Sequence, residues 1–237
     1  MLGILGGMGP MATVDFMSKV IRHTPATCDQ DHIPTIVCSA ARVPDRTAAI
    51  LGLGADPLPA LRRALRQLEE GGASLIAMPC NTAHFWHAAL QAETSLPILH
   101  IVDAVADHLL SRASRPGSVG ILATAGTMQA GIYQQRLAQR NIASVVPRED
   151  GQAMVMRAIR LIKAGDVVNA RALLAAEALA LSEAGCGAIV MGCTEIPIAF
   201  AGSDQHFAVP LVDATDVLAK ASVEAFLTRD RALASAA

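Results

Sequence analysis

The two halves of this 237-residue chain repeat one another at a nearly constant spacing. The repeat is visible in four pairs of residues with similar neighbours: Gly3 and Gly120 are 117 positions apart, Cys80 and Cys193 are 113, Pro97 and Pro210 are 113, and Asp103 and Asp213 are 110. Loop insertions of a few residues would leave such small differences in a duplicated unit. The repeat therefore predicts two similar lobes related by an approximate twofold axis.

Each half alternates short apolar runs with segments of helical periodicity. Strands are expected at residues 2–5, 34–39, 75–78 and 96–102, and again at 118–124 and 188–191. Alternating strands and helices form parallel sheets, because each strand returns through a helix to lie beside the previous one. We therefore expect an α/β fold of two pseudo-symmetric lobes, each a parallel sheet flanked by helices.

Capping and spacing predict two further helices. Asp103 is expected to cap a helix that reaches about residue 112, because an Asp side chain accepts hydrogen bonds from the first free N–H groups of a helix. After Thr127, the residues Met128, Ile132 and Leu137 recur at near-helical intervals and predict one continuous helix.

Composition argues against several classes of protein. Apolar residues make up 52% of the chain, yet no run reaches the roughly 18 residues of a membrane span, and the N-terminus lacks a signal-peptide pattern. A net charge of −2 without Lys/Arg runs argues against nucleic acid as a partner. The five cysteines form no C-x-x-C pair and the seven histidines have no ligand spacing. We expect reduced thiols, no metal and a cytoplasmic location.

Two cysteines stand where an apolar run gives way to a helix, namely Cys80 and Cys193. Ligands bind at this edge of open α/β sheets, and a helix N-terminus lowers the pKa of a thiol, which favours the reactive thiolate. A single buried cysteine is most simply a small core residue, as we expect for Cys28, Cys38 and Cys186. Two cysteines in equivalent turns, brought face to face by a pseudo-twofold axis, indicate a function.

Two opposed thiols suit one reaction in particular. One thiolate removes a proton from a carbon atom and the opposite thiol returns one, which is racemisation and needs no redox cofactor. Beside them, Asn81 offers an amide donor, and Thr82 and Thr194 can cap a helix or bind a carboxylate. His84 and Glu195 are placed either to tune the thiols or to make local hydrogen bonds.

The motifs around these residues resemble those of the aspartate/glutamate racemase superfamily, in particular its aspartate racemase branch. The similar segments, in the expected order between about residues 2 and 226, are Gly6-Gly7-Met8-Gly9-Pro10, Pro44-Asp45-Arg46-Thr47, Pro79-Cys80-Asn81-Thr82-Ala83-His84, Thr124-Ala125-Gly126-Thr127 and Gly192-Cys193-Thr194-Glu195. Glutamate racemases more often have His after the second Cys-Thr, whereas this chain has Glu195. That difference favours aspartate.

The resemblance implies pyridoxal-independent, two-base catalysis by Cys80 and Cys193 without a cofactor, usually in a homodimer. It also implies that the C-terminal helix packs back on the first lobe. The first lobe is then discontinuous, with residues 1–98 plus 211–237, and the second comprises 99–210. The active site is expected in the cleft between the lobes.

Recognition of a dicarboxylate requires cations. Arg46 resembles the family's ligand for the side-chain carboxylate, and its guanidinium suits bidentate binding. Lys163 resembles a second cation, although it could equally interact with the dipole at its helix end. The other expected substrate-binding residues surround the thiols: Met8, Asn81, Thr82, Thr124, Thr127, Thr194 and Glu195.

Other functions are open at this point. The nearest alternative is another superfamily activity, such as hydantoin racemase or maleate isomerase, while an arylmalonate-type decarboxylase would use only one cysteine. Residues 7–12 match the dinucleotide pattern G-x-G-x-x-A, but the second expected strand does not end in the acidic residue that would hold a ribose. A non-catalytic ligand-binding module would leave the second cysteine turn without a purpose.

Overall fold

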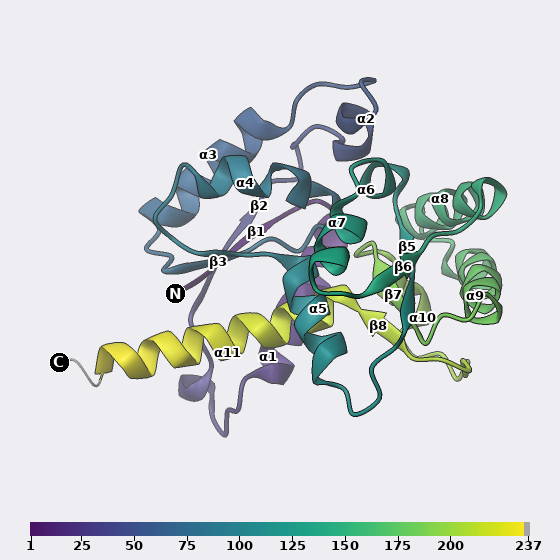
Figure 1. Cartoon of the computed structure of the whole chain (residues 1–237). Coiled ribbons are helices and arrows are strands. Elements are labelled where there is room, and N and C mark those ends of the chain that lie inside the picture. The colour runs from purple at the N-terminus through teal and green to yellow at the C-terminus, as the bar shows by residue number, and fades with distance from the viewer. Residues whose placement is uncertain (235–237) are drawn as a thin grey trace.

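The computed structural model describes residues 1–234, which fold into two parallel sheets (Figure 1). The strand order is β2-β1-β3-β4 in the first sheet and β6-β5-β7-β8 in the second. Their bounds are β1 (Leu2–Gly6), β2 (Thr35–Ser39), β3 (Leu75–Ala77), β4 (Ile98–Leu99), β5 (Ser118–Ala123), β6 (Ala143–Val145), β7 (Ala188–Gly192) and β8 (Leu211–Asp213). The predicted fold class, an α/β protein with two parallel sheets, is confirmed.

Helices connect the strands and flank both sheets (Figure 1). They are α1 (Pro10–His23), α2 (Arg46–Ile50), α3 (Leu58–Glu70), α4 (His87–Gln91), α5 (Ile101–Ser111), α6 (Ala125–Gln129), α7 (Ile132–Gln139), α8 (Glu149–Lys163), α9 (Val167–Glu183), α10 (Ile196–Phe200) and α11 (Ala214–Ala234), with 3-10 helices η1 (Asp29–Asp31) and η2 (Thr82–Trp86). Among residues 1–234, no helix has both the length and the apolar character needed to cross a membrane.

Two outer cores and one shared core hold these layers together. α3 packs Leu61, Leu65 and Leu68 against the first sheet, at the helical spacing read from the sequence. α8 and α9 cover the second sheet. Between the sheets, Leu2 of β1 and Val190 of β7 belong to one apolar cluster with parts of α5 and α11. The division into 1–98 plus 211–237 and 99–210 stays a prediction, and residues 235–237 lie outside the described range.

The register of the two sheets agrees with the repeat. Leu2 lies opposite Leu75 in the first sheet, and Val119 lies opposite Ala188 in the second. Equivalent positions are therefore 117 residues apart in β1 and β5 and 113 apart in β3 and β7. These are the spacings of Gly3 to Gly120 and of Cys80 to Cys193, so both cysteines follow equivalent strands.

The end of the fourth strand differs from the prediction. α5 begins directly after His100, whose Nδ1 accepts a hydrogen bond from the Val102 N–H at 3.2 Å. Asp103 lies in the first turn of α5 and is not its cap. In the second half, Asp213 accepts from the Thr215 N–H at 2.9 Å, at the start of α11. The spacing between the capping residues His100 and Asp213 is 113, so the pairing of Asp103 with Asp213 was wrong.

The continuous helix predicted after Thr127 is instead two helices, α6 and α7. Gly131 separates them with a φ of 63°, a left-handed conformation that glycine adopts without steric cost. The apolar spacing runs through the break because Met128 and Leu137 pack against the same shared core. The break also leaves Tyr133, at the start of α7, fully buried.

α11 returns the chain from the second sheet to α1 and lies against α1 and α5 (Figure 1). Lys19 of α1 is 3% exposed, and its ammonium group lies 2.6 Å from Oδ2 of Asp213. A buried charge is stable only when it is paired. This ion pair joins α1, which follows the first strand, to the end of β8.

Candidate active site

A small cavity of about 30 Å³ lies at the carboxyl ends of the central strands of both sheets. Ligands bind at this edge in α/β proteins. The cavity is lined by Met8, Asp45, Arg46, Thr47, Cys80, Asn81, Thr82, Thr124, Lys163, Cys193, Thr194 and Glu195. The structure therefore brings together all the residues predicted from the sequence except Thr127, which lies behind Thr82 and Thr124.

A larger cavity of about 690 Å³, which we call the vestibule, adjoins this one. The two cavities share Asp45, Arg46, Lys163 and Glu195. The other walls of the vestibule are mainly apolar: Gly7, Gly9, Pro10, Met11, Ala41, Val43, Ile162, Gly165 and Ile198. The small cavity is thus open to a wider space through a boundary of four charged residues.

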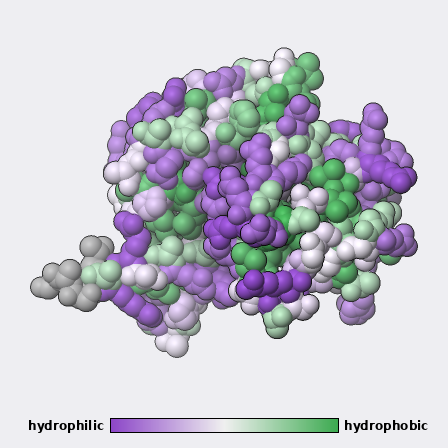
Figure 2. All heavy atoms as spheres, viewed as in Figure 1, coloured by the Kyte–Doolittle hydropathy of each residue, from purple (hydrophilic) through white to green (hydrophobic). Residues whose placement is uncertain are grey.

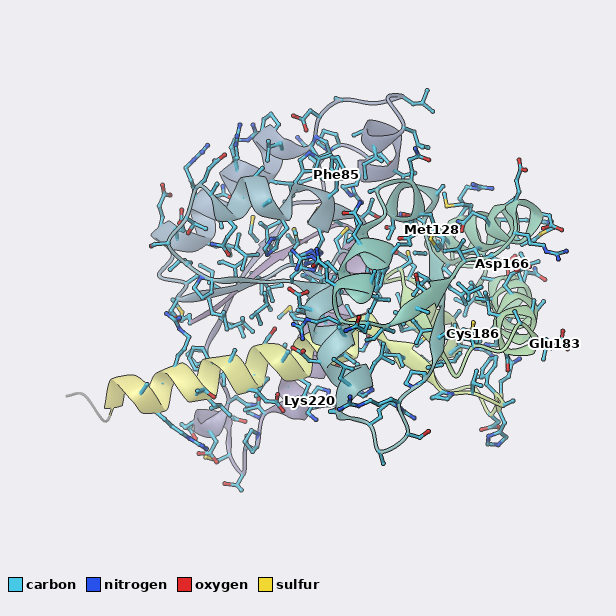
Figure 3. The ribbon with its side chains drawn as sticks, in the orientation of Figure 1. Phe85, Met128, Asp166, Glu183, Cys186 and Lys220 are labelled. Atoms are coloured by element: carbon cyan, nitrogen blue, oxygen red, sulfur yellow. The ribbon has the colours of Figure 1, made fainter. Side chains whose placement is uncertain are left out.

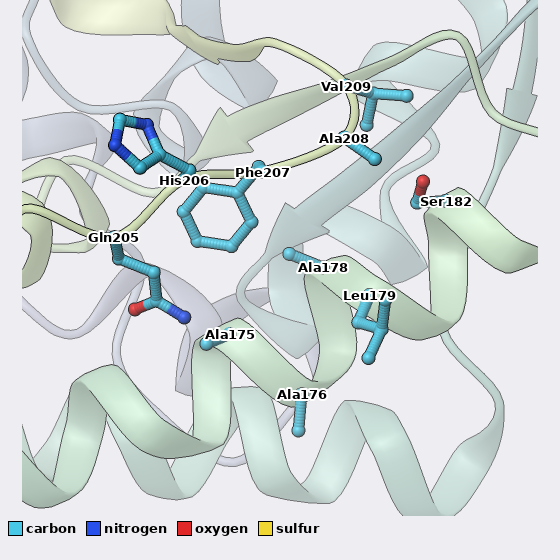
Figure 4. Close-up of a pocket in the computed structure, with 10 residues that line it drawn as sticks. All are labelled: Ala175, Ala176, Ala178, Leu179, Ser182, Gln205, His206, Phe207, Ala208 and Val209. Atoms are coloured by element: carbon cyan, nitrogen blue, oxygen red, sulfur yellow. The ribbon is translucent and has the colours of Figure 1, made fainter.

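Another cavity, away from both cysteine turns, lacks this chemistry. A cavity of about 270 Å³ between α9 and residues 205–209 is lined mostly by alanine and other apolar side chains, without a cysteine or a carboxylate (Figure 4). The face shown in Figure 2 mixes polar and apolar side chains. Hydropathy alone does not mark a site there, so we assign the candidate site by its chemical groups.

Cys80 lies in the turn between β3 and η2 and is 5% exposed. Burial raises the pKa of its thiol, while the charge of Arg46 and a hydrogen bond from the Ala83 backbone lower it. The net direction is upward, opposite to the direction expected from the sequence. The reason is that η2 is one short turn, and its N–H groups do not compensate the desolvation of a thiolate.

Cys193 lies in the matching turn between β7 and α10 and is 4% exposed. Its thiol donates a hydrogen bond to Oε2 of Glu195 at 3.1 Å, and the Thr194 hydroxyl donates to the same oxygen at 3.2 Å. Burial, and then the Glu195 carboxylate, raise the pKa of Cys193 well above its ordinary value. Lys163 lies 3.9 Å from the other Glu195 oxygen. Cys80 is thus beside a cation and Cys193 beside an anion.

Three threonine hydroxyls form a closed triangle at the wall of the cavity. Thr82 lies 3.0 Å from Thr124 and 2.9 Å from Thr127, and the last two hydroxyls are 3.0 Å apart. Thr124 also accepts from the Thr127 N–H at 3.1 Å, which caps α6. The triangle joins the first cysteine turn to the second half of the chain.

Two buried hydrogen-bond donors in the lining have no partner, Nε of Arg46 and Nδ2 of Asn81. The Arg46 Nη1 donates to the backbone oxygens of Val43 and Pro44 at 3.2 and 3.1 Å, which holds the guanidinium in place. An unpaired buried donor costs about 1–3 kcal/mol. Both donors therefore favour a ligand that supplies acceptors, such as a carboxylate.

Hydrogen bonds of the His84 side chain hold the first cysteine turn in place. Its Nε2 accepts a hydrogen bond from the Ile101 N–H at 3.1 Å, so Nδ1 carries the proton and donates to the Cys80 carbonyl oxygen at 2.9 Å. Burial lowers the pKa of His84 to about 3. Of the two roles considered from the sequence, the structure favours local hydrogen bonding over proton exchange with the thiol.

Three residues of the site were not singled out from the sequence. Asp45 and Thr47 line the cavity on either side of Arg46, and the quoted motif from Pro44 to Thr47 contained that signal. Tyr133 donates a hydrogen bond to the side chain of Asn81, although the two residues are 52 positions apart. No local pattern could have indicated this contact.

The other three cysteines lie outside the cavity. Cys186, labelled in Figure 3 near the end of α9, is 2% exposed in the outer core of the second sheet. Cys28 is exposed, and Cys38 is half-buried beside Gln67. Within residues 1–234, no three His, Cys, Asp or Glu side chains are grouped in a way that could hold a metal ion.

Two parallel sheets of the same strand order, with one thiol at the carboxyl end of β3 and another at the end of β7, define a duplicated α/β fold whose candidate site is lined by residues of both halves. The chain belongs to the Asp/Glu/hydantoin racemase family, whose sequence profile matches residues 5–222. It is therefore an isomerase of the racemase type. The resemblance read from its motifs is confirmed.

Individual relatives agree with this assignment. The chain is 28% identical over 234 residues to the broad specificity amino-acid racemase RacX of Bacillus subtilis (strain 168), covering 96% of this chain and 98% of RacX. It is similar in structure to the Picrophilus torridus aspartate racemase, with a TM-score of 0.83, 31% identity and coverage of 94% and 93%. A Francisella tularensis glutamate racemase in complex with D-glutamate has a TM-score of 0.69 at 16% identity, covering 97% and 81%, which shows the fold alone.

Proposed function

We propose that this chain is a cofactor-independent racemase of aspartate, with glutamate as a second substrate, and that Cys80 and Cys193 exchange protons with Cα. One observation carries the proposal: two thiols share a small cavity with two unpaired donors, on Arg46 and Asn81. The thiols supply two proton carriers, and the donors match the carboxylates of an acidic amino acid.

In this reaction the thiolate of one cysteine takes the Cα proton of the bound amino acid. The electron pair left on Cα is delocalised into the α-carboxylate, which the hydroxyl and N–H groups of the two turns stabilise. The thiol of the other cysteine then delivers its proton to the opposite face of Cα. The product is the enantiomer, and thiol and thiolate have exchanged places.

The surroundings of the two thiols suggest how the resting enzyme is protonated. Arg46 favours the thiolate at Cys80, whereas the Glu195 carboxylate favours the protonated form of Cys193. We propose that Cys80 is the thiol that ionises more readily, so that it acts first as the base with Cys193 as the acid. The form with the Cys80 thiolate acts on the enantiomer whose Cα–H faces Cys80, and the form left after turnover acts on the other.

Two of the four charged residues at the mouth of the cavity are cations, and these support a dicarboxylate substrate. We propose that Arg46 and Lys163 hold the side-chain carboxylate, since both lie on the boundary with the vestibule. Lys163 is within 4 Å of Glu195 and half-exposed, so it can turn to a ligand without losing a buried position. The α-carboxylate would bind to Asn81, Thr82, Thr124 and Thr194. Met8 would contact the bound substrate as part of the cavity lining.

A second candidate is racemisation of amino acids with longer side chains. The vestibule of about 690 Å³ and its apolar walls, such as Met11 and Ile162, favour it. The similarity to RacX, named as a broad specificity racemase, points the same way. Initial rates on aspartate, glutamate, leucine and methionine would separate the candidates, because the primary proposal predicts turnover of aspartate and glutamate but not of leucine or methionine.

Hydrogen exchange tests the primary proposal. The purified protein, without added cofactor, would be incubated with L-aspartate in D2O, and the Cα–H signal followed by NMR together with optical rotation. We expect the Cα–H signal to disappear as deuterium replaces the proton, and the optical rotation to fall to zero as the enantiomers mix. Lack of exchange with aspartate, glutamate and the other amino acids would refute the proposed function.

The roles of the thiols are tested by Cys80→Ala and Cys193→Ala. Each variant should lose racemisation, because the two thiols serve opposite faces of Cα. Cys186→Ala is the matched control, since Cys186 is equally buried but lies outside the cavity. Full activity in either cavity variant would remove that thiol from the mechanism.

We also propose a homodimer, as the family resemblance implies. One face of α1 exposes Met11, Val14 and Ile21, which are 68%, 58% and 56% accessible. Exposed apolar patches of this kind mark protein interfaces. Sedimentation equilibrium would give twice the monomer mass, and a Val14→Glu variant should shift the protein toward monomer.

A further inference from the structure

Tyr133 is the single tyrosine of the chain, and its side chain is fully buried between the two cysteine turns. It is the second residue of α7, placed there by the left-handed Gly131 that ends the preceding turn. A tyrosine hydroxyl in a dry interior requires a hydrogen-bond partner. The partner is a residue of the candidate site.

The Tyr133 hydroxyl donates a hydrogen bond of 2.6 Å to Oδ1 of Asn81. Asn81 is 3% exposed and lines the cavity directly after Cys80. Since the carbonyl oxygen of its amide is held by Tyr133, its Nδ2 group is the end left without a partner. The hydrogen bond therefore selects one of the two orientations of the amide, and in that orientation the free end is a donor.

The ring of Tyr133 also touches the second cysteine turn. A Cβ atom on Gly192, the residue before Cys193, would lie 3.1 Å from Cε2 of Tyr133, which is closer than ordinary contact. Burial, and then the negative charges of Asp213 and Cys193, raise the pKa of Tyr133 far above its ordinary value. The hydroxyl thus stays protonated and keeps the proton that it donates to Oδ1 of Asn81.

We propose that Tyr133 is a positioning residue that orients the amide of Asn81, so that Nδ2 donates to the α-carboxylate of the substrate. It acts through Asn81 and does not touch the substrate itself. By resting against Gly192 as well, it holds the two turns at a common spacing. The proposal depends on the proposed function, because it assigns a task within that same site.

Tyr133→Phe tests this role, because it removes only the hydroxyl and keeps the ring against Gly192. Asn81 binds the α-carboxylate in the ground state, and this hydrogen bond strengthens as negative charge develops on that carboxylate in the transition state, so its loss of orientation should raise KM and also lower kcat. We expect kcat/KM to fall at least about tenfold, the effect of one hydrogen bond to a charged group, with part of the loss in KM. An unchanged KM would overturn the proposal.

A double-mutant cycle separates positioning from general structural damage. Asn81→Ala should raise KM at least as much as Tyr133→Phe, and the double variant should show no further increase, since the hydroxyl acts only through Asn81. If the KM increase of the double variant equalled the product of the two single increases, Tyr133 would not act through Asn81. Ser222→Ala is a matched control, because it also removes a fully buried hydroxyl, which donates to the Leu218 carbonyl oxygen in α11. It should lower the melting temperature without raising KM.

A spectroscopic measurement makes the result independent of activity. Tyrosine labelled with ¹³C at Cζ gives one resonance, because the chain has one tyrosine. The resonance should shift in the ligand-free Asn81→Ala variant. A resonance that does not move there would overturn the positioning role even if the wild-type enzyme racemises aspartate. If no amino acid is racemised, the proposed function fails and the role in substrate binding fails with it.

Discussion

Lys19 offers a direct test of what holds the two halves of the molecule together. Its side chain is 4% exposed, and its ammonium group lies 2.6 Å from Oδ2 of Asp213, which is 20% exposed, and also contacts Asp15, which is 31% exposed. Lys19→Met keeps the length and the apolar stem of the side chain. The variant removes only the charge, so it leaves the carboxylate of Asp213 without its counter-ion.

The size of the effect follows from burial. Removing one member of a buried ion pair destabilises a protein by about 3–5 kcal/mol, because the other charge stays desolvated. Asp15 is exposed enough to turn toward water, and Asp213 keeps some contact with solvent. We therefore expect Lys19→Met to lower the free energy of unfolding by about 3 kcal/mol, the lower end of this range. The total free energy of unfolding of a protein is roughly 5–15 kcal/mol.

Urea denaturation followed by circular dichroism measures this loss as a lower midpoint at constant slope. The second variant, Asp213→Asn, removes the charge but keeps Oδ1 as acceptor for the Thr215 N–H, since Asn caps helices as well as Asp does. The double variant, with Lys19→Met and Asp213→Asn together, should lose about 2 kcal/mol less free energy of unfolding than the sum of the two single losses. A loss below about 1 kcal/mol for Lys19→Met, or strict additivity, would refute the reasoning.

Two further predictions follow from titration. Iodoacetamide should modify Cys80 and Cys193 slowly at neutral pH and faster as the pH rises, because burial raises the pKa of both thiols. Cys80 should react first, since the charge of Arg46 lowers its pKa whereas the Glu195 carboxylate raises the pKa of Cys193. Peptide mass spectrometry checks this, and reaction of Cys193 first at pH 7 would contradict it. Burial lowers the pKa of His84 to about 3. Below pH 6.5 the unfolded state therefore binds a proton that the folded state does not, and stability should fall by up to about 1.4 kcal/mol per pH unit. Equal urea midpoints at pH 7 and pH 5 would exclude this contribution.

Local sequence patterns were sufficient for most of the strands and helices. The Leu61, Leu65 and Leu68 spacing gave a helix because one face of it packs on a sheet, and that requirement is visible in a few consecutive turns. Capping was harder, because His100 caps α5 with a ring nitrogen while Asp103, the better capping type, lies inside the helix. The break at Gly131 was missed because the residues on both sides of it pack into one core.

The candidate site was predictable to the extent that it lies in the repeat. Cys80 and Cys193 follow equivalent strands 113 residues apart, so parallel sheets place both at the binding edge. The direction of their pKa shifts was not predictable, since burial depends on every layer around the turn. The Tyr133 to Asn81 hydrogen bond was equally invisible, because it joins two residues with no shared local pattern.

The amino-acid sequence by itself thus determined the fold class, the duplication and the two residues most suited to proton transfer. Each of these depends on periodicity or on spacing along the chain, which the sequence contains directly. Only the tertiary structure decided that Cys80 lies beside Arg46, that the Cys193 thiol donates to the Glu195 carboxylate, and that Tyr133 donates a hydrogen bond to Asn81. Desolvation, charge and hydrogen-bond partners are set by atoms that come together only when distant segments pack, so no stretch of sequence carries them alone.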